Sequence, residues 1–171
     1  MALPNIISNV AAPLLGLIDM AILGHLDNVA YIGSVALGNV IFNFIFWNFA
    51  FLRMGSSGLT AQAYGAKDPE KCMSILSQSM TCGILGAILL IAFQVPIDML
   101  AFNVLDGSNE TKQLAREYFY IRIYAAPATI GMYALTGWFI GMQNSIIPMI
   151  VSICVNVVNI LLNLIFVFAL N

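Results

Sequence analysis

Long apolar runs alternate with short polar segments along this chain of 171 residues. A bilayer core about 30 Å thick requires roughly 20 helical residues to cross it, and the intervals between charge clusters reach that length repeatedly. We therefore predict an all-α protein with five membrane-spanning helices, over residues 4–26, 32–64, 72–102, 110–141 and 149–170. Together they would form one polytopic transmembrane lobe, residues 1–171.

Polar segments mark the expected connections between these helices. The sequence GAKDPE at Gly65–Glu70 combines a helix stop signal at Gly65 with a helix start signal at Pro69. Further turns are expected at residues 27–28, 103–109 and 143–148. Backbone polar groups in lipid need internal partners, so only helices or closed barrels cross a membrane. The sequence lacks the short alternating segments of barrel strands.

The composition excludes several classes of protein. Hydrophobic residues make up 61% of the chain and charged residues only 8%, whereas soluble domains carry roughly 25% charged residues. A net charge of −2 gives no reason to expect a nucleic-acid partner. Cys72, Cys82 and Cys154 have spacings that fit neither a zinc site nor a disulfide framework. The expected partner is the lipid bilayer.

Asp19 is the residue that points most directly to function. It lies in the middle of the first predicted span, where a carboxylate is costly unless it is paired, hydrated or protonated. Such residues usually mark ion pathways, although a structural carboxyl bonded to a neighbouring helix is the alternative. Pro13 precedes it by six residues and should kink the span, either as a hinge or as a static bend.

Polar residues also recur at helical spacing in the fifth predicted span. Ser152, Asn156, Asn159 and Asn163 share one face and predict either a polar cavity lining or a hydrogen-bond ladder between helices. Asn39 and Asn43 form a weaker pair, four residues apart, in the second span.

Other unusual positions have plain structural explanations. We expect Arg53 to reach the membrane interface and His25 to lie at a span end rather than to bind a metal. The small residues of GSSGLTAQAYGA, residues 55–66, should permit tight helix packing.

Four segments together resemble the multidrug and toxic compound extrusion (MATE) transporters, in particular the DinF-like subgroup. They are PNIISNVAAPLLGLIDMAILGHL, GSSGLTAQAYGAKDPEK, APATIGMYALTGWFIGMQNSIIPM and NVVNILLNLIF, and they cover nearly the whole chain. The resemblance implies twelve helices in two lobes, and exchange of protons or sodium ions for small organic, often cationic, compounds. This chain would then be a truncated N-terminal part, without the sixth helix and the C-terminal lobe.

The resemblance also implies roles for particular residues. Asp19 would be the coupling-ion site, where a sodium ion could bind, and Asn159 would share it. Asn163 stands where the family often has a second aspartate, which argues against a site with two carboxylates. No cofactor is expected. The N-terminus and the loop with Lys67 and Lys71 would face the cytoplasm from a cell (inner or plasma) membrane.

Ion-coupled antiport is therefore the function that the sequence favours. One alternative is a flippase for lipid-linked oligosaccharides, which is disfavoured because the spans show no clear cationic lining for phosphate head groups. The other is a non-transporting accessory protein or small enzyme. An enzyme would need converging reactive groups, and the sequence indicates none.

Overall fold

The computed structural model describes the backbone of residues 29–168 and the side chains of residues 30–165. The chain divides into two compact units, residues 33–142 and a second unit made of residues 1–32 and 143–171. The first predicted span, with Asp19, Pro13 and His25, lies outside the described residues. Each unit is therefore considered by itself.

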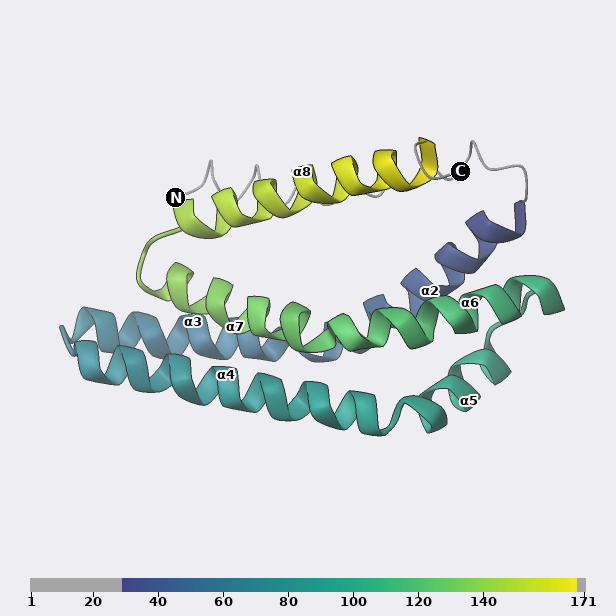
Figure 1. The fold of residues 1–171 in the computed structure, drawn as a ribbon. Helices are drawn as coiled ribbons and strands as arrows, with labels where there is room; N and C mark the ends of the chain where they lie inside the picture. Colours follow the sequence, from purple (N-terminus) through teal and green to yellow (C-terminus); the bar gives the residue numbers. More distant parts are fainter. Residues whose placement is uncertain (1–28, 169–171) are drawn as a thin grey trace. The chain divides into compact units, whose positions relative to one another are not determined.

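The described part of the chain is helical and contains no strand, which confirms the predicted fold class. Four of its helical stretches are long and apolar enough to cross a membrane: Ala30–Gly65, Pro69–Ala92, Asn109–Gly141 and Ile146–Ile165. The helices, labelled in Figure 1, are α2 (Val29–Asn48), α3 (Ala50–Gly65), α4 (Pro69–Ala92), α5 (Gln94–Val104), α6 (Asn109–Arg122), the 3₁₀ turn η1 (Ile123–Ala125), α7 (Ala126–Gly141) and α8 (Ile146–Phe168).

Three of the predicted spans are divided by a break in the helix. Pro96 and Pro127 explain two of them, because a proline cannot donate to the carbonyl four residues earlier, and the breaks fall at Phe93 and at η1. The third break, at Phe49, has no proline. There the Asn48 side-chain amide donates to the Phe44 carbonyl at 2.7 Å and competes with the backbone for this acceptor.

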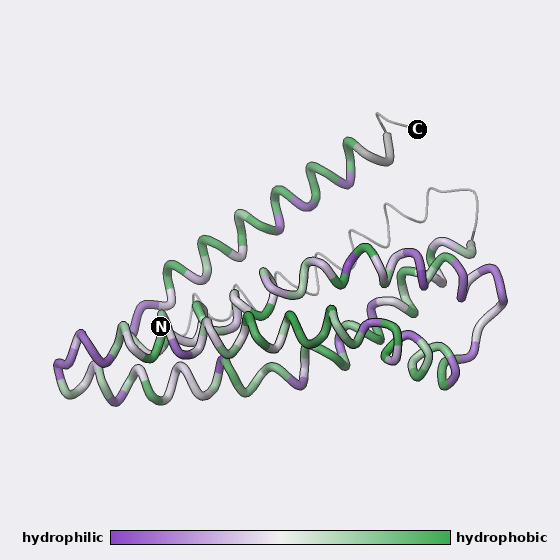
Figure 2. The backbone as a smooth tube through the Cα atoms, turned by 60° about the horizontal axis from the view of Figure 1, so that its bottom comes forward, coloured by the Kyte–Doolittle hydropathy of each residue, from purple (hydrophilic) through white to green (hydrophobic). Residues whose placement is uncertain are grey.

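The turn between α3 and α4 confirms both signals at Gly65–Glu70. α3 ends at Gly65 and α4 begins at Pro69, and the Asp68 carboxylate caps α4 by accepting from the Lys71 backbone N–H at 2.9 Å. Lys67 adopts a left-handed conformation, with φ of 55°. Figure 2 shows hydrophilic residues at this turn.

Small residues bring α3 and α7 into close contact. A methyl group at Gly141 would lie 2.7 Å from the Ser57 carbonyl oxygen, and one at Gly137 would overlap the Ser56 hydroxyl. Ser56 also donates to the Ala134 carbonyl at 3.3 Å. The predicted tight packing is confirmed at these positions, because only small residues let two backbones approach so closely. Gly55 and Gly58, in contrast, face open space.

A second contact ties α7 to α4, in the unit of residues 33–142. The Trp138 indole N–H donates to the Cys72 carbonyl at 2.9 Å, and the Cys72 side chain is buried. All three cysteines are free thiols. In the same unit, a larger apolar cluster around Phe42, Phe119 and Ile130 forms the core.

Much of the apolar surface is not buried by protein. In the Pro69–Ala92 span only 17% of the most apolar 18-residue window is buried, and large side chains such as Leu85 and Leu89 are exposed. Exposed apolar area on this scale is not stable in water and is expected of helices that contact lipid.

Candidate functional site

A cluster of polar and aromatic side chains joins α2 to α6. The Arg122 guanidinium donates through Nη1 to the Asn39 amide oxygen and to the Tyr118 hydroxyl, and Tyr118 lies 3.5 Å from the same amide oxygen. The Arg122 guanidinium carbon also lies 4.9 Å from the Phe42 ring centroid and 5.3 Å from that of Tyr118. We call Arg122, Asn39, Tyr118 and Phe42 the arginine cluster.

Local sequence explains why these four side chains meet. Tyr118 and Arg122 are one helical turn apart on α6, so they share a face. Gly38 leaves the space that the Tyr118 ring occupies, since a methyl group there would lie 2.6 Å from its Cε1 atom. Asn39 and Phe42 belong to the same stretch of α2, and Phe42 is 1% exposed. The packing of Tyr118 against α2 thus fixes the position of Arg122.

Two further polar contacts join α5 to α6. Arg116 pairs with Asp98 at 3.2 Å, the two side chains being 49% and 11% exposed. Lys112 donates to the Phe102 carbonyl at 3.2 Å. Arg116 also lies over the Phe102 ring, 5.3 Å from its centroid. Cationic side chains of α6 therefore contact both α2, through Arg122, and α5, through Arg116 and Lys112.

The polar face predicted for the fifth span lies on α8, which belongs to the other unit. Ser152, Asn156, Asn159 and Asn163 are all half-buried, and the Asn163 amide donates to the Asn159 amide oxygen at 3.0 Å. This bond connects two residues of one helix. Whether the face lines a cavity or bonds to another helix stays a prediction.

The predicted site residues are therefore not all brought together by the described structure. Asn39 belongs to the arginine cluster, Asn43 is exposed elsewhere on α2, and the α8 asparagines lie in the second unit. Asp19 and Pro13 are outside the described residues. Within the described residues, no group of three or more His, Cys, Asp or Glu side chains could hold a metal ion.

Sequence reasoning missed the contribution of Arg122 and Tyr118. The predicted span 110–141 includes both residues, and α6 continues through η1 directly into α7, but no function was assigned to either side chain. One signal was available: Arg122 is the last charged residue of the chain. Its partner Asn39 is 83 positions away, so only the fold reveals the contact.

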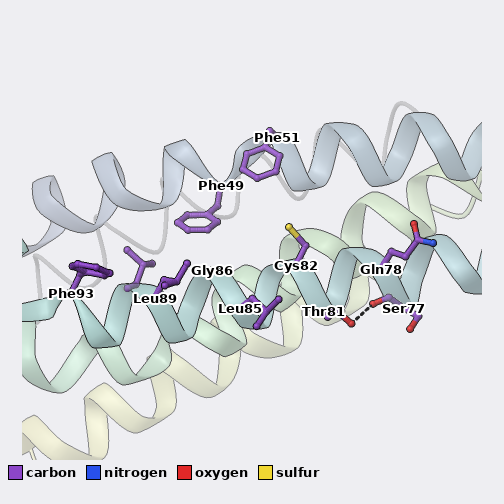
Figure 3. A pocket seen from close by; sticks show the side chains of 11 residues that line it. Phe49, Phe51, Ser77, Gln78, Thr81, Cys82, Leu85, Gly86, Leu89 and Phe93 are labelled. Atoms are coloured by element: carbon purple, nitrogen blue, oxygen red, sulfur yellow. Dashed lines mark hydrogen bonds between the residues drawn. The ribbon is translucent and has the colours of Figure 1, made fainter.

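An apolar groove lies where α2 meets α3, facing α4. It encloses about 730 Å³, and its walls include Phe49, Leu85, Leu89 and Phe93. Figure 3 shows the Phe49 ring over Gly86, with Ser77, Gln78 and Thr81 toward one end. Thr81 donates to the Ser77 carbonyl at 2.8 Å, so its hydroxyl is satisfied within α4. The groove is open and mostly apolar.

The apolar spans and the interior polar clusters define a helical integral membrane protein. Residues 4–165 match the MatE family, and the chain belongs to this family. The chain is 40% identical over 171 residues to DNA damage-inducible protein F of Escherichia coli, and the matched region covers 100% of this chain and 37% of that protein. This match confirms the resemblance seen in the sequence. The chain is also 27% identical over 169 residues to the probable multidrug resistance protein NorM of Thermotoga maritima, covering 98% of this chain and 36% of that protein.

The fold also matches a solved structure. A MOP superfamily transporter from Pyrococcus furiosus superposes with a TM-score of 0.90 at 22% identity, covering 100% of this chain and 38% of that one. At this identity the match supports the fold alone. The chain thus spans little more than a third of the length of each of these three proteins.

Proposed function

We propose that a full-length transporter containing this chain exports small organic compounds, cations among them, in exchange for protons or sodium ions. The observation that carries the proposal is the family match over residues 4–165. Relatives named as multidrug export or multidrug resistance proteins support export as the direction of transport. The chain would supply the N-terminal lobe in an inner or plasma membrane, and a C-terminal lobe would be its partner.

In this proposal Asp19 carries the coupling ion. A carboxylate inside a membrane favours either a bound proton or a bound cation, because both remove the cost of an isolated charge. Asn159 and Asn163 would offer neutral amide oxygens beside it, and their mutual hydrogen bond supports a preorganised pair. Asn156, Asn39 and Asn43 would contribute further polar groups to the cavity.

Pro13 would let the first span change shape when Asp19 gains or loses its ion. A proline leaves one backbone carbonyl without its helical donor and weakens the helix locally. Occupancy of Asp19 could then bias the span between two bends, one open to each side of the membrane. The exported compound and the ion would use the cavity alternately.

The test is Asp19→Asn in the full-length transporter, reconstituted in liposomes. We expect loss of efflux driven by either a proton or a sodium gradient, with normal membrane insertion. The matched control is Asp27→Asn, which removes a carboxylate from the turn predicted to follow the first span and should leave efflux unchanged. Gradient-driven efflux that persists in Asp19→Asn would refute the role of Asp19, and comparing the two gradients in the unmodified protein identifies the ion.

A further inference from the structure

The arginine cluster places a permanent positive charge in a membrane-spanning stretch. Arg122 lies within the Asn109–Gly141 span and is half-buried. An arginine remains protonated in proteins, and a partly buried charge is costly unless another group compensates it. The group that compensates the charge of Arg122 is therefore expected to be either a neighbouring side chain or a bound ligand.

The neighbours that hold Arg122 are all neutral. Its hydrogen-bond partners among the described residues are the Asn39 amide oxygen and the Tyr118 hydroxyl, and its ring contacts are Phe42 and Tyr118. Within the described residues, no carboxylate lies within 4.0 Å of the Arg122 guanidinium. The ion pair found among these residues joins Arg116 to Asp98. The cluster positions the guanidinium without neutralising it.

The geometry leaves part of the guanidinium for a ligand. An arginine has five N–H donors in a planar fork, and the two contacts above both use Nη1. The N–H groups on Nε and Nη2 meet no acceptor among the described residues. That edge of the fork matches the two oxygens of a carboxylate or phosphate, and the two aromatic contacts hold its plane in place.

We propose that Arg122, held by Asn39, Tyr118 and Phe42, binds an oxyanion: the carboxylate or phosphate of an organic compound or of a lipid head group. The proposal goes beyond ion-coupled export, and it can stand if export fails, because it concerns binding alone. It would place a cationic group in a stretch for which the sequence indicated no clear cationic lining.

The test measures binding of dansylglycine, which carries one carboxylate, and of its uncharged methyl ester. The full-length transporter is held in a neutral detergent, and dansyl fluorescence reports binding. Charge-assisted hydrogen bonds contribute about 1.5–3 kcal/mol, so Arg122→Gln should weaken dansylglycine binding about tenfold or more. It should leave the ester almost unchanged. Arg122→Lys keeps the charge but loses the fork, so it should give an intermediate affinity.

The matched control is Arg53→Gln, which removes a charge from another spanning stretch. Arg53 is exposed, so this variant should bind both compounds like the unmodified protein. Equal loss of dansylglycine and ester binding in Arg122→Gln would mean that Arg122 only joins α2 to α6, and would overturn the proposal. Dansylglycine binding that does not change would overturn it too, since the charge would then be compensated within the protein.

Competition identifies the source of the oxyanion and needs no variant. Benzoate, inorganic phosphate, phosphatidylglycerol or phosphatidylcholine is added to the unmodified protein with dansylglycine bound, and the loss of dansyl fluorescence measures displacement. Displacement by benzoate or phosphate supports a site for small anions, and displacement by phosphatidylglycerol but not by phosphatidylcholine supports a lipid head group. If no anion displaces dansylglycine, the site does not select for an oxyanion and the proposal fails, even if Arg122→Gln does not fold.

Discussion

The contact between α3 and α7 predicts opposite effects for two glycine substitutions on neighbouring helices. In Gly141→Ala the new methyl group would lie 2.7 Å from both the Ser57 carbonyl oxygen and the Thr60 Cβ atom, about 0.7 Å closer than ordinary contacts, which begin near 3.4 Å. The two backbones must separate, and overpacking of this kind typically costs about 1–3 kcal/mol. Gly58→Ala meets no atom within 4 Å and should only gain helix propensity, up to about 1 kcal/mol.

The two variants should therefore differ by about 2 kcal/mol in the free energy of unfolding. For a chain of 171 residues that corresponds to roughly 4–8 °C in melting temperature, on the scale measured for soluble proteins. Buried Cys72, next to α7, provides the probe. With Cys82→Ser and Cys154→Ser in the background, a thiol-reactive maleimide reports unfolding on heating. If Gly141→Ala and Gly58→Ala melt together, the close approach of α3 and α7 is wrong.

Two further predictions use the same heating assay. Trp138→Phe removes the hydrogen bond to the Cys72 carbonyl and should lower stability by about 1 kcal/mol, with faster labelling of Cys72; an unchanged labelling rate would contradict that contact. Arg116→Gln should destabilise more than Asp98→Asn, because it leaves a carboxylate that is 11% exposed without its partner. Since Arg116 is half exposed, the difference should be only about 1 kcal/mol, and equal effects of the two substitutions would show that the pair contributes little.

Each of the four candidate spans in the described residues overlaps a span predicted from the sequence, but the breaks inside the predicted spans were not anticipated. Stretches without charge are a sufficient signal for membrane helices, because lipid penalises every charge within them. Pro96 and Pro127 carried the information for two breaks, but a proline in a membrane helix can also be accommodated without one. The break at Phe49 has no proline, and the Asn48 side chain that bonds to the Phe44 carbonyl can also point away from a helix, so the sequence alone does not predict it.

The candidate site divides in the same way. A single carboxylate in an apolar run, as at Asp19, can be recognised without a structure because its cost is local. Arg122 escaped notice because it follows a charged helix and looks like an interfacial residue. The structure shows that Arg122 is held by Asn39 and Tyr118. These contacts depend on how α2 and α6 pack, which the local sequence does not specify.

Lys67 in the α3–α4 turn accepts a backbone conformation that suits glycine better. Its φ of 55° carries a strain of roughly 1–2 kcal/mol for a residue with a side chain. Replacing it with glycine would relax the turn, yet it would also remove one of the two lysines at or next to this turn, Lys67 and Lys71. Positive residues in short loops direct which side of a membrane a loop remains on during insertion. If this loop faces the cytoplasm, as the family resemblance implies, a less strained turn at residue 67 would come with a weaker orienting charge during insertion.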